Sequence, residues 1–165
     1  MSENSSELLL IGWREWLALP GLGIQHIKAK IDTGARTSAL HAFYVDPFTS
    51  RGGQWVRFGI HPLQRDSETV VECESPVKDH RAVTDSGGHQ EHRYVIESTL
   101  SLGARKWPVE ITLTNRDSMK FRMLIGRTAL RGNFLVDSAS SYRFGKVTAK
   151  QISAYRQAIS SRTTT

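Results

Sequence analysis

Residues 29–42 read Ala-Lys-Ile-Asp-Thr-Gly-Ala-Arg-Thr-Ser-Ala-Leu-His-Ala, which places an acid between a strand-like run and a tight turn. Apolar and charged residues alternate over 27–31, the period of a strand with one buried face. Asp32 ends that run, so a rigid element aims its carboxylate. Gly34 allows a sharp turn and a close backbone approach, and the Thr33 hydroxyl can hydrogen-bond across an interface. The stretch predicts a carboxylate mounted for catalysis.

A second stretch, residues 121–130, reads Phe-Arg-Met-Leu-Ile-Gly-Arg-Thr-Ala-Leu and strengthens this interpretation. Asp-Thr-Gly-Ala resembles the active-site motif of aspartic proteases, in particular the single-motif retropepsins. Retropepsins also carry an apolar-apolar-Gly-Arg segment that enters a short helix and precedes a closing strand, here residues 133–137. The resemblance implies that Ile125, Gly126 and Arg127 support the active-site loop from beneath.

The partner of Arg127 is left open by the sequence. A guanidinium fork suits bonding to backbone carbonyls or to a carboxylate. Retroviral members pair this arginine with an acid shortly after Asp-Thr-Gly, but residues 35–38 read Ala-Arg-Thr-Ser and contain no acid. The same departure puts Arg36 close to the expected cleft.

Four segments together narrow the resemblance: residues 11–16, 29–42, 93–96 and 113–127. They are similar to a bacterial retropepsin-like family often labelled "ATP-dependent zinc protease". Its members are encoded near, or fused to, ribosomal-protein glutamate ligases of the ATP-grasp type. The resemblance implies an all-β fold, a closed β-barrel with a flap hairpin and one short C-terminal helix. The sequence does not support the words "ATP-dependent" in this label, because it contains no Gly-x-x-x-x-Gly-Lys-Ser/Thr loop of the kind that binds ATP phosphates.

The length of 165 residues suits one domain. We expect an N-terminal extension over 1–10, a retropepsin-like domain over 11–146, and a polar tail over 147–165. Helical spacing of Ile152, Tyr155 and Ile159 favours a helix in that tail, with residues 160–165 frayed. Strand-like runs separated by turn formers indicate a barrel or sandwich; they are 8–11, 13–19, 27–31, 55–60, 94–96, 107–114 and 134–136.

One Asp-Thr-Gly motif supplies one carboxylate, whereas aspartic-protease chemistry uses two that share a proton. A homodimer with twofold symmetry would set Asp32 against its copy, since such an interface is self-complementary. We therefore expect Asp32, Thr33 and Gly34 to form the catalytic motif of a homodimeric peptidase. Asp85-Ser86-Gly87 is a formal second triplet, but the chain has no second lobe to carry it.

Residues 84–91 instead indicate a hairpin tip between strands over 81–83 and 93–96. In retropepsins the hairpin at this place is the flap, a glycine-rich lid over the substrate. The resemblance implies that substrate contacts come from the active-site loop and this tip: Ala35, Arg36, Ser86, Gly87 and Gly88. A surface hairpin without function is the open alternative.

Lys and Arg number 22 against 16 Asp and Glu, a net charge of +6 that favours anionic partners. Nucleic acid is not expected, because aromatic interleaving and groove-reading motifs are missing; the cluster Arg116, Lys120, Arg122, Arg127 and Arg131 is best explained as a solvated face. The family context suggests glutamate-rich peptide tails, attracted by Lys28, Lys30 and Arg36. The alternative function is a non-catalytic module that binds a peptide or partner and regulates a glutamate ligase.

Other classes of protein fit poorly. No cofactor is expected, and no zinc site either, because the six histidines form no His-Glu-x-x-His motif and Cys73 is the single cysteine. Those histidines are His26, His41, His61, His80, His89 and His92. No apolar run approaches the ~18 residues of a membrane helix, so a cytoplasmic protein without a membrane partner is expected.

Overall fold

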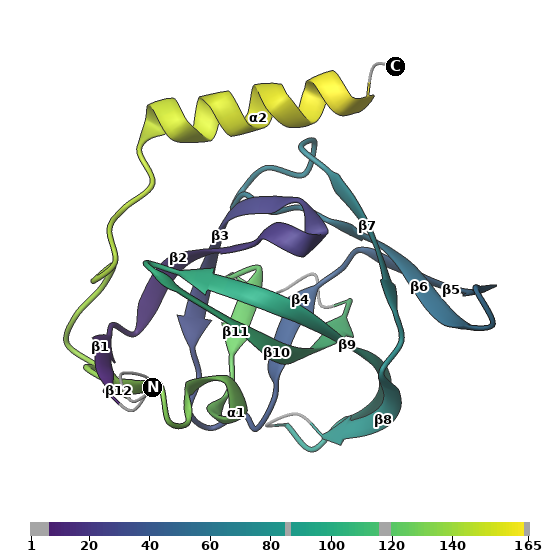
Figure 1. The fold of residues 1–165 in the computed structure, drawn as a ribbon, viewed down its shortest axis with the longest axis horizontal. Helices are drawn as coiled ribbons and strands as arrows, with labels where there is room; N and C mark the ends of the chain where they lie inside the picture. Colours follow the sequence, from purple (N-terminus) through teal and green to yellow (C-terminus); the bar gives the residue numbers. More distant parts are fainter. Residues whose placement is uncertain (1–6, 85–86, 116–119, 164–165) are drawn as a thin grey trace, which may run out of the picture.

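The computed structural model describes residues 7–84, 87–115 and 120–163, which form a mostly β fold with one long helix at its top (Figure 1). A seven-stranded sheet has the order β10-β4-β11-β3-β2-β9-β8. Its strands, in chain order, are β2 (Arg14–Leu19), β3 (Ile24–Ile31), β4 (Ser38–His41), β8 (Asp79–Thr84), β9 (Gln90–Leu102), β10 (Arg105–Thr114) and β11 (Met123–Ile125). Most predicted strands are present, several of them longer than expected.

The sheet order nearly returns on itself, because β10 at one end also pairs with β9 near the other. The β9–β10 ladder is long, running from Arg105↔Leu102 to Thr112↔Val95. The β2–β9 pairing consists of the single pair Ala18↔Ser101. The mostly β, retropepsin-like architecture agrees with the expected fold class, whereas full closure into a barrel stays a prediction.

Strand β11 lies between β3 and β4, although β3 and β4 follow each other in the chain. It runs parallel to β3, with Leu124 opposite Lys30, and antiparallel to β4, with Leu124 opposite Ala39. The connection from β3 to β4 must therefore pass over the end of β11. That connection is residues 32–37, so the topology alone brings Asp32 and Gly126 together.

A second sheet of three antiparallel strands, β5 (Tyr44–Ser50), β6 (Gly53–Ile60) and β7 (Val71–Pro76), projects to the right in Figure 1. Strand β7 alternates strictly between buried and exposed residues, so one face covers the core. Phe58 and Ile60 are fully buried there, together with β3 residues such as Ile24 and Ile27. One core therefore spans both sheets.

The predicted hairpin is confirmed. Strands β8 and β9 pair antiparallel, from Asp79↔Val95 to Thr84↔Gln90, and the tip of the hairpin follows Thr84. Ser86, a predicted substrate contact, and Asp85 lie outside the described residues.

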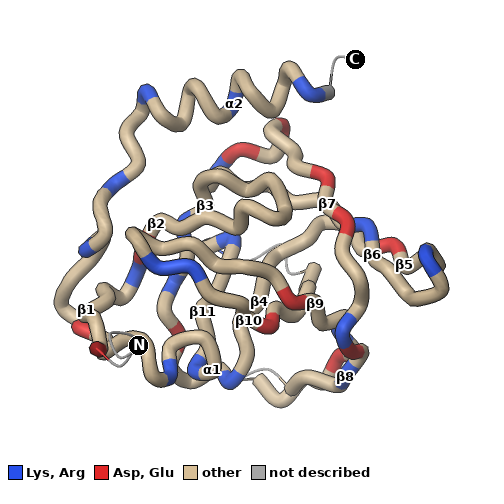
Figure 2. Tube along the Cα trace, in the orientation of Figure 1, with Lys and Arg blue, Asp and Glu red and all other residues tan. Residues whose placement is uncertain are grey.

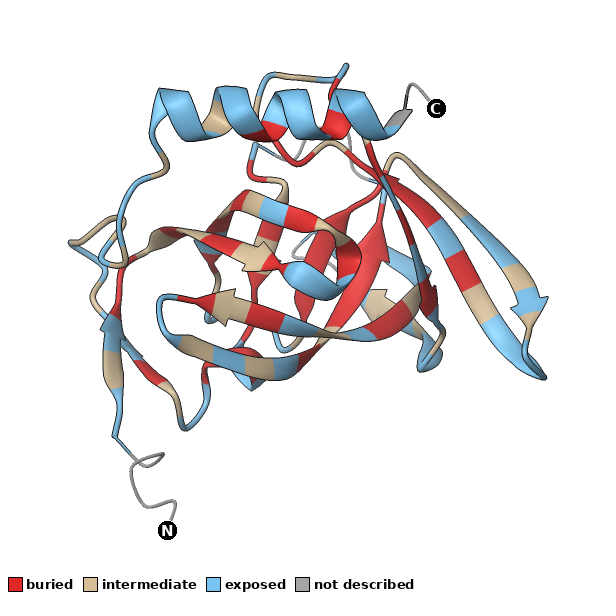
Figure 3. Cartoon of the chain, turned by 45° about the horizontal axis from the view of Figure 1, so that its top comes forward, coloured by how far each residue is buried: buried red, intermediate tan, exposed pale blue. Residues whose placement is uncertain are grey.

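Two α-helices follow. Helix α1 (Arg127–Leu130) is the short helix expected after Gly126, and α2 (Ala149–Thr163) occupies the tail. Only one edge of α2 is buried, at Tyr155 and Ile159, and this edge faces the sheets (Figure 3). We expected residues 160–165 to be frayed, but the helix continues to Thr163. The expectation is therefore wrong for residues 160–163. Within the described residues, no helix has the length and apolar character needed to span a membrane.

The chain ends of the domain meet in a small parallel sheet of β1 (Leu9–Ile11) and β12 (Phe134–Val136). Residues 137–148, called the strap below, then lead along one side of the fold to α2 (Figure 1). Glu15 is fully buried beneath the strap, and its carboxylate accepts hydrogen bonds from the backbone N–H groups of Gly12, Arg143 and Phe144 at 2.7, 3.0 and 3.3 Å. These charge-assisted bonds attach the strap to β2.

Candidate active site

Asp32 follows β3 and is fixed through its backbone. Its N–H donates to the carbonyl of Ile125 at 2.8 Å, and its own carbonyl accepts from Ala35 N–H at 3.2 Å. The Gly34 N–H donates to carboxylate Oδ1 of Asp32 at 3.1 Å. The turn therefore orients the carboxylate with a main-chain donor, the Gly34 N–H.

Gly126 forms the floor beneath this turn. A Cβ at this position would lie 2.6 Å from the carbonyl carbon of Thr37 and 3.0 Å from the carbonyl oxygen of Ala35. The buried Gly126 N–H donates to the hydroxyl of Ser38 at 3.1 Å. Only glycine allows the loop to approach α1 so closely.

The partners of Arg127 are backbone carbonyls of the Asp32 loop. Its guanidinium donates to the carbonyls of Thr33 and Gly34 at 3.0 and 3.1 Å, while its backbone N–H donates to Ala35 O at 2.8 Å. Three consecutive carbonyls of the turn are thus bound by one residue. The missing acid at 35–38 is explained, because Nη1 of the guanidinium binds backbone carbonyls directly.

A cleft of about 740 Å³ opens above this floor. The described residues that line it come from the Asp32 loop, from β4, β8, β9, β10 and β11, and from α1; they are Asp32, Gly34, Ala35, Arg36, Thr37, Ala39, Arg81, Ala82, Val83, Thr84, Arg93, Thr112, Leu124 and Arg127. Asp32 is the one carboxylate among them, against four arginines. Asp32, Gly34, Ala35 and Arg36 thus share one cleft, while Thr33 is exposed at its edge and contributes its carbonyl to Arg127.

The roof of the cleft is β8, whose residues 81–84 face the Asp32 loop across the cavity. Arg81 bonds Asp79 at 3.0 Å and Glu110 at 3.5 Å, so its charge is balanced. Arg93 is 8% exposed and is paired with Glu91 and, at 3.5 Å, with the Thr112 hydroxyl. Arg36 differs, because no acid among the described residues contacts its exposed side chain.

The predicted contacts of Gly87 and Gly88 with substrate stay a prediction. Gly87 and Gly88 are exposed and do not belong to the described residues that line the cavity. Gly88 has a φ of +85° and open space around the position of a Cβ. Lys28 and Lys30, which were expected beside the cleft, are not among the described residues that line it.

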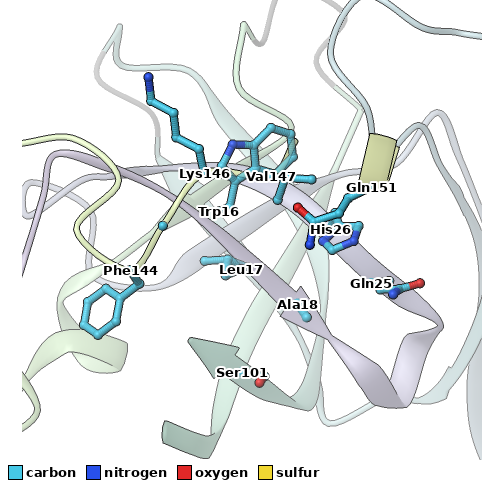
Figure 4. A pocket seen from close by; sticks show the side chains of 11 residues that line it. Trp16, Leu17, Ala18, Gln25, His26, Ser101, Phe144, Lys146, Val147 and Gln151 are labelled. Carbon is cyan, nitrogen blue, oxygen red and sulfur yellow. The ribbon is translucent and has the colours of Figure 1, made fainter. Parts of the chain in front are cut away.

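A second, smaller hollow of about 230 Å³ lies between β2, β3 and the strap (Figure 4). Trp16, His26, Phe144, Lys146 and Gln151 are among its walls. Burial lowers the pKa of His26 below its ordinary value. No acidic residue is among the described residues that line this hollow.

The arrangement of metal-binding side chains gives no support to the zinc in the family label. Across residues 7–84, 87–115 and 120–163, no three His, Cys, Asp or Glu side chains gather as a metal site would need. His80 and His92 come within 5.6 Å between ring centroids, and His80 stacks on Tyr94 at 4.3 Å. Burial raises the pKa of the Cys73 thiol to about 12, which disfavours the thiolate that metals bind.

A carboxylate mounted on a glycine turn, a strand inserted beneath that turn and a hairpin above it define a retropepsin-like β protein. The chain belongs to the RimB-like family, described as retropepsin-like aspartic endopeptidase RimB, whose family model matches residues 10–146. This agrees with the resemblance deduced from the sequence.

The names of curated relatives differ from the description of the family. A "probable alpha-L-glutamate ligase" of Parasynechococcus marenigrum is 47% identical over 146 residues, which is 88% of this chain and 31% of that protein. One of Shewanella pealeana, with the same name, gives the same identity and coverage. The chain thus spans about a third of the length of these relatives. A crystal structure of a Legionella pneumophila protein of unknown function shares the fold, with a TM-score of 0.69 at 23% identity, covering 84% of this chain and 99% of that one.

Proposed function

We propose that the chain is an aspartic endopeptidase whose catalytic dyad consists of Asp32 from two copies of the protein. The observation that carries the proposal is the one carboxylate among the described residues of the cleft, which accepts a main-chain hydrogen bond above a glycine floor. Membership of a family described as aspartic endopeptidases supports it. In this proposal residues 11–146 are the catalytic unit, in the form of a closed barrel, 1–10 are an extension and 147–165 a tail.

The proposed chemistry is general acid–base hydrolysis. Two carboxylates that face each other hold one proton between them, because like charges about 3 Å apart resist joint ionisation. The ionised carboxylate takes a proton from a water molecule, which attacks the scissile carbonyl while the protonated partner polarises it. Thr33 and Gly34 complete the catalytic loop, and Ala35, Arg36, Ser86, Gly87 and Gly88 contact the peptide.

An exposed apolar surface supports the homodimer. The large hydrophobic side chains that are exposed among the described residues all lie at the β1–β12 sheet: Leu8, Leu10, Leu135 and Val136, at 43, 45, 54 and 38% exposure. Leu10 and Leu135 are directly opposite in register, so they form one patch. Such a patch is typical of a protein–protein contact, and a second copy is the partner that the dyad requires.

The test is incubation with a diverse peptide library, comparing the wild type, Asp32→Asn and the wild type with a chelator. Cleavage by the wild type, with or without chelator, and none by Asp32→Asn would support the proposal. Full cleavage by Asp32→Asn would contradict it, and loss of cleavage on chelation would indicate metal chemistry instead.

A second candidate function, a non-catalytic module that binds a peptide or partner and regulates a glutamate ligase, is favoured by one observation. The relatives named as ligases carry a region similar to this chain as 31% of their length. Under this alternative no peptide is cut, but the chain binds a ligase and changes its rate of glutamate addition. Measuring that rate with wild type and Asp32→Asn separates the two candidates, because a binding module tolerates the substitution.

A further inference from the structure

The outer face of β2 and β3 carries a row of cations and rings. Arg14 is opposite Lys30 and Trp16 is opposite Lys28 in the antiparallel register, so all four side chains share one face. The buried partners on the other face, Leu17 and Ala29 among them, belong to the core. Facing pairs of like charge weaken a sheet, so Arg14 opposite Lys30 is not explained by stability.

Tyr142 of the strap gathers three of these cations around its ring. The distances to the ring centroid are 4.9 Å from Arg14, 5.5 Å from Lys28 and 5.6 Å from Lys146. Lys28 also lies 5.2 Å from the ring of Trp16. Arg14 also lies 4.6 Å from the ring of Trp13. The rings hold the charges in place through cation–π attraction without neutralising them.

The backbone conformation and hydrogen bonds of the strap fix the position of the Tyr142 ring. Tyr142 has a φ of +55°, which is uncommon for a residue other than glycine. Its N–H donates to the Arg14 carbonyl at 3.0 Å, and the Arg14 guanidinium donates to the Ser141 hydroxyl at 3.1 Å. The buried Glu15 binds the next two backbone N–H groups, as described above. The ring is therefore fixed from both sides.

These cations have no acidic partner. Among the described residues, no carboxylate lies within ion-pair distance of Arg14, Lys28, Lys30 or Lys146. The acid of the strap, Asp137, is 3.9 Å from Arg143 instead. Figure 2 shows blue segments along β2, β3 and the strap, with the red segments mainly elsewhere. Four uncompensated charges on one face create a local positive potential that attracts a polyanion.

The surface is continuous with the Asp32 cleft. Lys30 is opposite Leu124, and Leu124 is opposite Ala39 across the inserted strand. Leu124 and Ala39 both line the cleft. Residues in register on neighbouring strands share a face, so the row Arg14–Lys30–Leu124–Ala39 leads from the cations into the cleft.

We propose that Arg14, Lys28, Lys30 and Lys146, with Trp13, Trp16 and Tyr142, form an exosite for an acidic stretch of the polypeptide that enters the Asp32 cleft. The inference rests on the proposed peptidase function. Carboxylates fit this basic surface better than nucleic-acid bases do, because each ring is already engaged by a cation of the chain itself. Single-stranded nucleic acid needs free ring faces on which bases stack. Preorganised cations lower the ordering cost of binding a flexible acidic chain.

The test measures binding separately from cleavage. Fluorescence anisotropy with Asp32→Asn as the background uses three probes, an oligoglutamate peptide, an oligoglutamine peptide of equal length and an oligouridylate. The oligoglutamate is expected to bind most tightly and to weaken as salt rises. In the same background, Lys28→Glu with Lys146→Glu should weaken oligoglutamate binding by about tenfold at low salt, because each change replaces attraction with repulsion.

The matched control is Arg51→Glu with Lys106→Glu, which changes the net charge equally on exposed positions elsewhere. This control should change oligoglutamate affinity less than about twofold. Tyr142→Leu keeps every charge and should weaken binding by about threefold, since the cations lose the ring that holds them. Thermal unfolding of each variant checks that it is folded.

The outcomes distinguish the exosite from the peptidase. Equal weakening by the two charge-reversal pairs, or tighter binding of oligouridylate than of oligoglutamate, would overturn the exosite. Lys28→Glu with Lys146→Glu in the otherwise wild-type chain should still cleave neutral peptides at the normal rate. If no peptide is cut by any variant, the peptidase proposal fails while the binding result still decides the exosite.

Discussion

The floor and the roof of the cleft are built in contrasting ways. The floor, residues 32–37 over Gly126 and Arg127, is joined by main-chain hydrogen bonds of 2.8 to 3.2 Å and leaves no room for one added carbon. In the roof, strand β8 carries only exposed and half-buried residues. At Gly88 in the tip a Cβ would meet nothing within 4 Å.

The contrast between floor and roof indicates which part of the cleft must hold its atoms in fixed positions. Under the proposed function, a carboxylate that meets its copy across a symmetry axis tolerates little displacement, which suits a close-packed support bonded through the backbone. A lid in that function lets a peptide enter and leave, which suits a hairpin with few buried contacts. Substitutions should therefore act strongly in the floor and weakly in the roof.

Gly126→Ala should give the largest effect. The added Cβ would overlap the Thr37 backbone, and overpacking of this kind costs about 1–3 kcal/mol. Peptide cleavage should be lost, because the Asp32 loop must move away. Urea unfolding and the peptide assay provide the measurement. Gly53→Ala is the control, since nothing lies near that position, and an unchanged Gly126→Ala variant would contradict the rigid floor.

Arg127→Lys tests whether the geometry of the guanidinium matters. A lysine keeps the charge but is shorter and lacks the rigid plane that directs Nη1 at the Thr33 and Gly34 carbonyls, so we expect a loss of about 1 kcal/mol in stability and a clear fall in kcat. The comparison is Arg131→Lys, at an exposed position just beyond α1. Identical kinetics for the two variants would show that Arg127 does not position the loop.

Acid should destabilise the attachment of helix α2 before it destabilises the floor of the cleft. Burial acts to raise the pKa of Asp66, but hydrogen bonds from Thr69, Arg156 and Glu68 outweigh it and hold the pKa well below its ordinary value of 3.8. A depressed pKa means that the stabilisation is present above pH 3.8 and is lost as the pH falls below that value. The Asp66–Arg156 pair, at 3.0 Å, joins α2 to the body of the protein.

We therefore expect α2 to detach first on acidification, while the floor of the cleft persists. The measurement is hydrogen exchange of α2 at about pH 5 and at about pH 2, which lie above and below the value of 3.8 at which the stabilisation begins to be lost. Asp66→Asn should remove most of this pH dependence, whereas Asp46→Asn, at an exposed position, should not. Simultaneous exchange of α2 and β3 would contradict the separation.

Gly88→Ala in the roof should have the smallest effect. A φ of +85° costs a residue with a Cβ about 1 kcal/mol, but the tip has open space, so global stability should barely change. We expect a rise in KM of a few fold with little change in kcat. Gly88→Asn is the control, because asparagine accepts positive φ more readily, and a loss of activity as large as that of Gly126→Ala would erase the contrast.

The sequence predicted the floor better than the rest of the molecule. Asp32, Gly126 and Arg127 stand in short contiguous motifs, so local pattern was enough to find them. Glu15 could not be found in this way, because the N–H groups of Arg143 and Phe144 that it binds lie 128 and 129 residues away. Its one signal is its position in β2, where half-buried and buried residues alternate and Glu15 occupies a buried position.

Strands β5 and β7 were not expected for a similar reason. The buried positions of β7 include Cys73 and Ser75, which are weak hydrophobic signals, and β5 contains Pro47. Both strands are specified by pairing with β6 rather than by their own composition. The cations of β2 and β3 were visible in the sequence, but their arrangement in one row that leads to the cleft depends on the strand register.

The most direct test of the central claim, that two copies of Asp32 form one active site, is subunit mixing. Wild type and Asp32→Asn are unfolded together, refolded at different ratios, and assayed for peptide cleavage at constant total protein. A shared site predicts that activity follows the square of the wild-type fraction, so an equimolar mixture retains about one quarter. A linear fall, with about one half retained, would show that each chain acts alone and would contradict the account.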